Sequence, residues 1–132
     1  TPHPGEFARL AAALRLPLSG DRLADARAMA ARTGAVVVLK GPRSVIADSA
    51  NRVCVCGRGS AALATGGTGD VLAGVIGALL ARGIDAYTAA RVAVHIHAAA
   101  GECHAHGTLG FTADDLPAAI AHALAAIPGA CR

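Results

Sequence analysis

The sequence predicts an α/β fold in which short strands come early and helices close the chain. Three observations carry this prediction. A continuous apolar run at 35–39, with three β-branched valines at its centre, lies between Gly34 and Lys40-Gly41, as in a strand buried on both faces. Two further short apolar segments, residues 44–47 and 53–56, flank a polar turn. Apolar residues recur at helical spacing both before and after these strands.

The elements before and around the strands follow from local patterns. Helical spacing predicts helices over residues 6–14 and 21–32, and Gly34 is placed to end the second. The segments at 44–47 and 53–56 are separated by Asp-Ser-Ala-Asn and are predicted to pair as a hairpin. Residues 57–69 are the longest irregular stretch.

Three helices are predicted to close the chain. The first starts directly after Asp70 and runs to about Arg82, and the second covers residues 85–105. Thr112 and Asp115 have the spacing of a capping box for the third, which runs to about residue 127 before Pro-Gly. No repeat or linker interrupts the pattern, so residues 1–132 are predicted to form a single domain.

Composition excludes several classes of protein. With 54% hydrophobic and 16% charged residues the chain is predicted to be globular. The net charge of +3 is spread thinly, with Lys40 as the single lysine, so no nucleic-acid partner is expected. The longest apolar stretch, residues 71–81, is shorter than the about 20 residues that span a bilayer, so no membrane segment is expected. No secretory signal is visible at the start.

Cysteine and histidine positions predict neither disulfides nor a metal centre. Cys54 and Cys56 alternate with valines as in a strand of a reduced protein, which favours a cytoplasmic location. His95 and His97 point about 200° apart on a helix and cannot share one ion. The cysteine spacing is also not that of zinc sites.

A glycine-rich turn at residues 66–69 leads directly into a predicted helix. Such a turn presents backbone N–H groups at the positive end of the helix dipole, an arrangement that binds anions and most often phosphate. Asp70 stands at its mouth, where a carboxylate either caps the helix or acts beside a bound phosphate or hydroxyl. The turn matches neither the P-loop nor the dinucleotide-binding pattern.

The segment Thr65-Gly-Gly-Thr-Gly-Asp-Val-Leu-Ala-Gly74 resembles the signature of the ribokinase-like superfamily, specifically of the ADP/ATP-dependent NAD(P)H-hydrate dehydratases. Two other segments match that family in order: residues 1–6, and residues 37–41 followed by 44–47. The resemblance implies a three-layer α-β-α fold, of which this chain looks like the C-terminal half. The N-terminal half would supply most of the central sheet.

The resemblance also implies an activity. A lyase of this family repairs hydrated NADH or NADPH: the ring hydroxyl is phosphorylated by a nucleotide, and phosphate is then eliminated to restore the cofactor. ADP or ATP would be the co-substrate, with both open on the sequence alone, and phosphoryl transfer implies Mg²⁺. The family analogy and the apolar helix at 85–105 favour a homo-oligomer.

Site residues are carried over by matching positions. Asp70 would contact the substrate and deprotonate or orient its hydroxyl, and His3 would be a second substrate contact. The amides of Gly67, Thr68 and Gly69 would stabilise the transferred phosphoryl group. The matching nucleotide contacts are Lys40, Gly41, Pro42, Arg43, Ser44 and Gly69. Residues 57–61 depart from the family pattern, so no contact is transferred there.

Two alternatives remain on the sequence alone. A ribokinase-like small-molecule kinase, acting on a hydroxymethylpyrimidine or thiazole alcohol, would share Gly67 to Asp70 but would not explain residues 1–6. A nucleotide-binding fragment without catalytic activity would need the glycine turn alone. A stable phosphorylated alcohol favours the kinase, and stabilisation by ADP without turnover favours the binding fragment.

Overall fold

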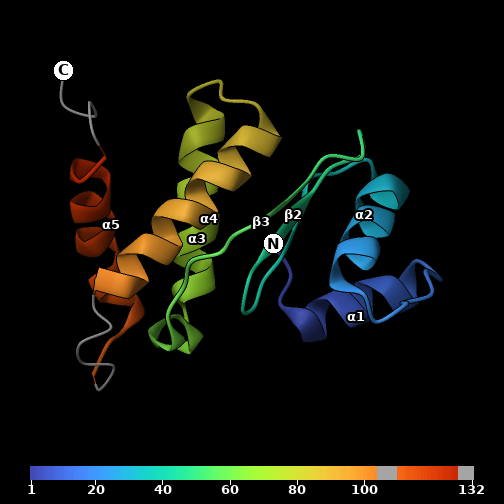
Figure 1. The fold of residues 1–132 in the computed structure, drawn as a ribbon, viewed down its shortest axis with the longest axis horizontal. Coiled ribbons are helices and arrows are strands. Elements are labelled where there is room, and N and C mark those ends of the chain that lie inside the picture. The colour runs from blue at the N-terminus through green and yellow to red at the C-terminus, as the bar shows by residue number, and fades with distance from the viewer. Residues whose placement is uncertain (104–109, 128–132) are drawn as a thin grey trace. The chain divides into compact units, whose positions relative to one another are not determined.

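The computed structural model describes residues 1–103 and 110–127 (Figure 1). Its internal contacts form two compact units. Unit 1 comprises residues 1–57 and 85–91, and unit 2 comprises residues 58–84 together with those described from 92 onward. The fold is α/β, as the sequence predicted, since helices accompany a small sheet.

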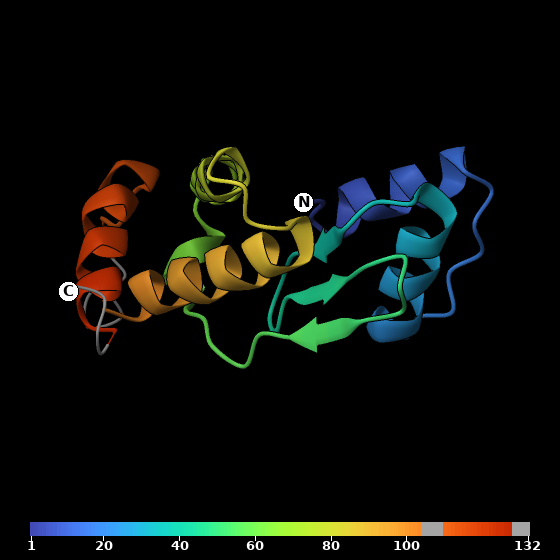
Figure 2. The same cartoon turned by 90° about the horizontal axis from the view of Figure 1, so that it is seen from above.

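Unit 1 is built from two helices and a three-stranded antiparallel sheet of order β1-β2-β3 (Figure 2). Every residue of β1 and β2 is buried, which confirms the buried strand and the hairpin expected from the sequence. The register pairs Val38 with Ile46 and Ile46 with Cys54. The elements are α1 (Pro4–Ala13), α2 (Arg22–Thr33), β1 (Val37–Leu39), β2 (Val45–Ala47) and β3 (Val53–Val55).

Small apolar side chains let the helices of unit 1 pack closely on its sheet. Ala26 and Ala30 of α2 are completely buried, together with Met29 between them. They share one cluster with side chains of alternate residues in β1 and β2, because successive strand side chains point to opposite faces. The α2 ends follow the sequence signals: the Asp21 side chain accepts a hydrogen bond from Leu23 N, and Gly34 closes the helix at φ 69°.

Asp25 ties the α1–α2 connection to the start of α2. Its carboxylate is buried and accepts hydrogen bonds from Ser19 N at 2.7 Å, Ser19 Oγ at 2.8 Å and Gly20 N at 3.2 Å. Burial raises the pKa of the Asp25 carboxyl, but the hydrogen bonds from Ser19 and Gly20 outweigh it, so the pKa lies below its usual value. Folding therefore favours the ionised form.

We expect Asp25→Asn to destabilise unit 1 by about 2 kcal/mol at neutral pH, because a charged acceptor of several hydrogen bonds is lost. The lowered pKa means that the unfolded chain binds the proton more readily, so this stabilisation is present above about pH 4 and is lost as pH falls through the folded pKa. Urea unfolding of both proteins at neutral and acid pH should show that the difference in unfolding free energy between the wild type and Asp25→Asn becomes smaller at acid pH. The exposed Asp114, as Asp114→Asn, is the control and should be nearly neutral at pH 7.

Unit 2 is helical, and its core combines residues from three helical elements with one loop residue, Phe111. Ala62, Ile96, Ala100, Phe111, Leu116, Ala119 and Ile120 form one buried cluster. Gly101 makes close packing possible, since a Cβ there would lie 2.5 Å from Leu63 Cγ. The elements are the 3₁₀ helix η1 (Ala61–Ala64), α3 (Thr68–Ala81), α4 (Ala86–Cys103), the 3₁₀ helix η2 (Ala113–Asp115) and α5 (Leu116–Ala125). The first residues of α4 belong to unit 1.

Helix boundaries in unit 2 differ from the sequence prediction at one important place. α3 begins at Thr68, so Thr68, Gly69 and Asp70 form its first turn rather than the end of a loop. The sequence missed this because the first turn of a helix can lack apolar periodicity. The predicted capping box is confirmed, with Asp115 Oδ2 accepting from Thr112 N at 2.8 Å. Residues 104–105 and 128–129, where the α4 end and the α5 stop were expected, lie outside the described residues.

Among the described residues, no helix has both the length and the apolar character needed to cross a membrane. Within the part of the chain that the structure describes, Cys54, Cys56 and Cys103 take part in no disulfide bond. Cys131 lies outside the described residues.

Candidate functional site

The turn before α3 depends on glycine at position 67. Gly67 is the N-cap of α3 and has φ 86°, in the left-handed region. A Cβ at this position would also lie 2.9 Å from the Ala113 Cβ. Both the backbone conformation and the close approach of η2 therefore favour glycine. Through this turn the chain enters α3 with residues 68–70 at the positive end of the helix dipole.

The backbone N–H groups of this turn are only partly used by the protein. Thr68 N donates to Thr65 O at 3.4 Å, and Asp70 N donates to Gly67 O at 3.0 Å. Within residues 1–103 and 110–127, the N–H groups of Gly67 and Gly69 have no protein acceptor. These two amides can therefore donate to an anion at the start of α3, whereas the amide of Thr68, the third that the sequence analysis named, is directed to Thr65 O.

Asp70 is exposed on the first turn of α3. No hydrogen bond or ion pair joins its carboxylate to any described residue, and α3 has no side-chain cap. Of the two roles left open by the sequence, capping of the helix is therefore not what the structure displays. The carboxylate is available to a ligand beside the amides of Gly67 and Gly69.

Thr68 and His97 brace the turn from inside. Thr68 is buried, and its Oγ1 lies 2.8 Å from Leu63 O and 2.9 Å from Thr65 O. His97, on α4, is also buried, with Nε2 2.9 Å from Thr68 O. A carbonyl oxygen can only accept, so Nε2 of His97 carries a proton. Sequence reasoning tested His97 only as a metal ligand and missed this role, because a partner 29 residues away leaves no local signal.

We expect His97→Leu to loosen the turn, because the variant removes the Nε2–H donor to the Thr68 carbonyl. Amide hydrogen exchange over residues 65–70 should become faster, and unfolding free energy should fall by about 1 kcal/mol. His97→Gln is the matched control, since its side-chain amide can still donate to the same oxygen. Equal exchange in wild type and His97→Leu would contradict the bracing role.

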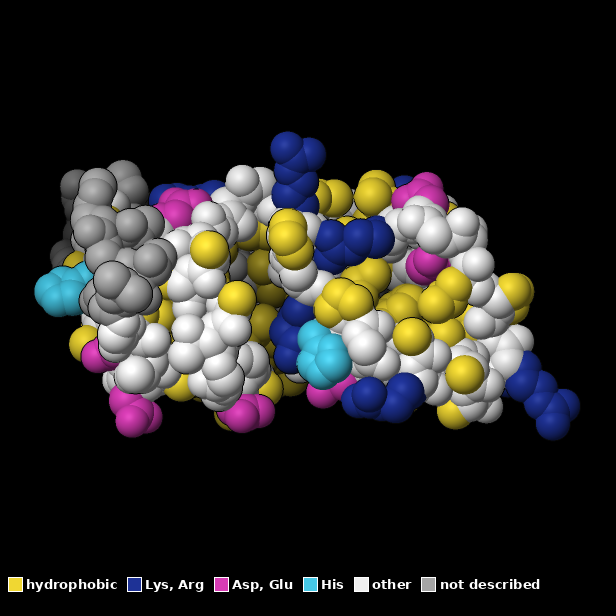
Figure 3. Space-filling model, turned by 90° about the horizontal axis from the view of Figure 1, so that it is seen from below, with side chains coloured by type: hydrophobic (Ala, Val, Ile, Leu, Met, Phe, Trp, Pro, Cys, Tyr) yellow, Lys and Arg dark blue, Asp and Glu magenta, His cyan; other side chains and the backbone are white. Residues whose placement is uncertain are grey.

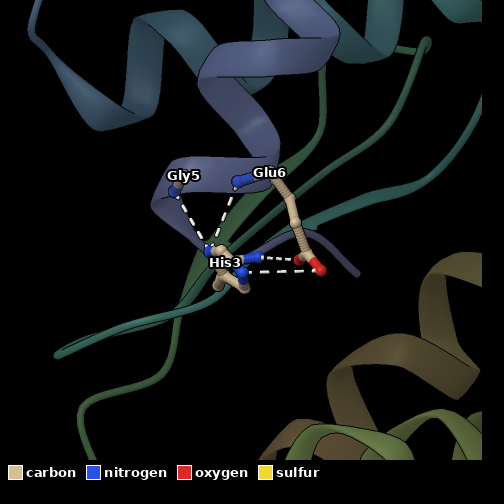
Figure 4. A network of polar contacts seen from close by, with 3 residues as sticks. All are labelled: His3, Gly5 and Glu6. Atoms are coloured by element: carbon tan, nitrogen blue, oxygen red, sulfur yellow. Dashed lines mark hydrogen bonds and ion pairs between the residues drawn. The ribbon is translucent and has the colours of Figure 1, made fainter.

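His3 caps α1 through its ring (Figure 4). Its Nδ1 accepts hydrogen bonds from Gly5 N at 3.1 Å and Glu6 N at 3.3 Å, while His3 N donates to Glu6 Oε2 at 2.7 Å. Because Nδ1 is an acceptor, the neutral ring carries its proton on Nε2, which lies 3.5 Å from Glu6 Oε1. The hydrogen bond from the His3 backbone lowers the pKa of the Glu6 carboxyl.

The ring of His3 therefore has two separate sides. Its Nδ1 is used by the start of α1, whereas its Nε2–H, on a side chain that is 52% exposed, faces Glu6 Oε1 at 3.5 Å. His3 has the extended backbone expected for a residue before proline, at φ −76° and ψ 167°. The capping by the ring is a role that the sequence analysis did not predict.

The predicted nucleotide segment is the loop between β1 and β2. Gly41, Pro42 and Arg43 are exposed, whereas Lys40 and Ser44 are half-buried. Lys40 N donates to Pro2 O at 2.9 Å, so the start of this loop lies beside the segment that carries His3. Within unit 1 the structure thus brings together His3 and the loop, two site elements that are far apart in the sequence. The turn at Gly67 to Asp70 belongs to unit 2.

The described residues contain no group of three or more histidine, cysteine, aspartate or glutamate side chains arranged to hold a metal ion. His104 and His106 lie outside the described residues. On the face drawn in Figure 3, Lys and Arg side chains lie among hydrophobic ones, and Asp and Glu side chains are also present on this face.

A family model described as NAD(P)H-hydrate dehydratase matches residues 1–122. The chain is 48% identical over 128 residues to the bifunctional NAD(P)H-hydrate repair enzyme of Gloeobacter violaceus, which covers 96% of this chain and 25% of that protein. It is 43% identical over 102 residues to the ADP-dependent (S)-NAD(P)H-hydrate dehydratase of Neisseria meningitidis, with 77% of this chain and 34% of that protein covered.

Solved structures of NAD(P)H-hydrate dehydratases also match this chain. The ADP/ATP-dependent NAD(P)H-hydrate dehydratase of Bacillus subtilis, co-crystallized with ATP/Mg²⁺ and soaked with CoA, matches with a TM-score of 0.83 and 34% identity. The match covers 92% of this chain and 46% of the Bacillus chain. The chain thus spans less than half of the solved relative and between a quarter and about a third of these two curated relatives.

Proposed function

This chain belongs to the NAD(P)H-hydrate dehydratase family, and we propose that it takes part in the nucleotide-dependent dehydration of hydrated NADH and NADPH. The observation that carries the proposal is the start of α3. Two amides without protein acceptors among the described residues, those of Gly67 and Gly69, lie beside the exposed carboxylate of Asp70. A phosphoryl group and the hydroxyl that receives it need such an arrangement.

In the proposed reaction, Asp70 accepts the proton of the ring hydroxyl or orients that hydroxyl toward the phosphoryl group. A bond forms between the hydroxyl oxygen and phosphorus, and the bond from phosphorus to the leaving nucleotide breaks. The amides of Gly67 and Gly69 stabilise the charge on the transferred group, and Thr68 supports them chiefly through its buried hydroxyl. Phosphate then leaves with the electron pair of its bond to the ring carbon, and a neighbouring ring carbon loses a proton.

We place the adenylate of ADP or ATP at the loop from Lys40 to Ser44. The loop lies beside the segment that carries His3, and this neighbourhood supports the placement of the nucleotide. His3 would then donate its Nε2–H to an oxygen of the hydrated cofactor bound next to the nucleotide. Mg²⁺, when bound, neutralises charge on the phosphates. The residues fit such an ion, since nucleotide-bound Mg²⁺ takes most ligands from phosphate and water, and the exposed Asp70 adds a carboxylate.

The proposal places residues 1–132 in the C-terminal half of one ribokinase-like catalytic domain. α3 supports this, because its sequence is apolar along most of its length, yet only Thr68 and Leu72 are buried. The rest of the domain would cover its exposed residues. We also propose a homo-oligomer, which the apolar sequence of α4 supports, and a location in the cytoplasm, which the alternation of Cys54 and Cys56 with valines supports.

Hydrated NADH incubated with the protein, Mg²⁺ and either ADP or ATP should regain the near-ultraviolet absorbance of NADH. Testing each nucleotide separately decides which is used. The assay is run on the 132-residue chain and on the intact product of its gene, whose mass shows whether further sequence completes the domain. Absence of regeneration by the intact product with both nucleotides refutes the activity, and a stable phosphorylated alcohol would instead indicate a small-molecule kinase.

A further inference from the structure

Arg22 binds the backbone of the loop to which the nucleotide is assigned. It is the first residue of α2, directly after the N-cap Asp21. Its guanidinium donates from Nη1 to Pro42 O at 2.5 Å, and from Nη2 to Leu39 O and Lys40 O at 3.2 Å each. One side chain therefore holds both the end of β1 and the first half of the loop. The planar fork of a guanidinium suits several acceptors at once.

The loop has a backbone that requires such support. Gly41 has φ 136°, and Arg43, which is not glycine, has φ 55°. A Cβ at position 41 would lie 3.1 Å from Arg22 Nη2, so glycine allows the guanidinium to approach. Uncommon backbone conformations persist when surrounding contacts determine them. Arg22 supplies contacts on the inner side, and Ser44 Oγ adds a hydrogen bond to Gly41 O at 3.1 Å.

The charge of Arg22 is not neutralised by the loop. Its acceptors in the loop are backbone carbonyls, and within the described ranges no carboxylate forms an ion pair with it. A guanidinium stays protonated at any physiological pH. Together with Lys40 and Arg43 it therefore makes this end of the sheet positive, which suits an anionic ligand such as a nucleoside diphosphate or triphosphate.

We propose that Arg22 is a positioning residue for nucleotide binding: by holding three carbonyl groups of residues 39–42 it fixes the loop in the form that receives the nucleotide. This inference rests on the proposed function. Arg22 acts through the loop, so it should affect nucleotide affinity and leave the chemical step at Asp70 unchanged.

The test compares Arg22→Met and Arg22→Lys with the wild-type protein. Arg22→Lys keeps the charge but cannot present two nitrogens to three carbonyls. Both variants should raise the KM for the nucleotide about tenfold, the equivalent of about one hydrogen bond, and leave kcat within about twofold. A purely structural defect would reduce the active fraction and hence kcat without raising KM. Arg27→Met, an exposed arginine on the same helix, is the control and should change neither constant.

Hydrogen exchange over residues 39–45 of the protein without nucleotide gives a second measurement that needs no activity. Exchange should be faster in both Arg22 variants and unchanged in Arg27→Met. If Arg22→Lys had the nucleotide KM and the hydrogen exchange of the wild-type protein, the positioning role would be wrong, because a positive charge alone would then be enough to hold the loop. If the wild-type protein has no dehydratase activity, the proposed function fails, while the exchange experiment still decides whether Arg22 fixes the loop.

Discussion

Asp70→Asn is expected to abolish dehydration of hydrated NADH while leaving the fold and nucleotide binding intact. Asparagine has the shape of aspartate but cannot accept a proton, so turnover should fall by at least about a hundredfold. The fold should tolerate the change, because the Asp70 side chain is exposed and bonded to no other described residue. Steady-state kinetics with ADP and ATP, together with calorimetric titration of the nucleotide, measure the two effects separately.

The matched control for Asp70→Asn is Asp114→Asn, which removes one exposed negative charge from the same unit. It should retain wild-type turnover. If Asp70→Asn also turned over at the wild-type rate, Asp70 would have no part in proton transfer or in orienting the hydroxyl. The assignment of the reaction to the start of α3 would then be wrong.

Gly67→Ala should impair both stability and activity. Alanine at φ 86° adopts the left-handed conformation at a cost of about 1–2 kcal/mol. Its Cβ would also meet the Cβ of Ala113 at 2.9 Å, so the turn or η2 must shift. A shift displaces the amides of Gly67 and Gly69 from the phosphoryl group, and we expect kcat to fall about tenfold or more. Thermal unfolding and kinetics of the same preparation measure both consequences.

Gly74→Ala, within α3, provides the contrast. Nothing lies within 4 Å of a Cβ at this position, and helix propensity favours alanine by about 1 kcal/mol. The variant should therefore be at least as stable as the wild type and equally active. If Gly67→Ala were as stable and as active as Gly74→Ala, the turn would not need glycine at position 67. The proposal that the amides of Gly67 and Gly69 must hold an exact position would then be wrong.

Elements with local signals were predictable from the sequence. Asp21 and Gly34 marked the ends of α2, and Thr112 with Asp115 marked the capping box, because each signal involves residues within one helical turn of the end that it marks. The buried strand β1 followed from the unbroken apolar run at 35–39, which has three valines at its centre. The start of α3 was placed too late, since Gly67 to Asp70 carry no apolar periodicity.

The sequence alone determined the α/β class and the family, and it predicted the chemistry that we propose, since a glycine turn, a carboxylate and a helix start are adjacent in the chain. The tertiary structure decided which side chains support the glycine turn and the loop between β1 and β2. His97 reaches Thr68 across 29 residues, and Arg22 reaches its three carbonyls across 17 to 20. The second role of His3, as the cap of α1, depended on the orientation of its ring. The contacts of His97 and Arg22 depend on how the elements pack, and packing distances leave no periodic trace in the sequence, whereas the His3 cap lies at the start of α1 itself.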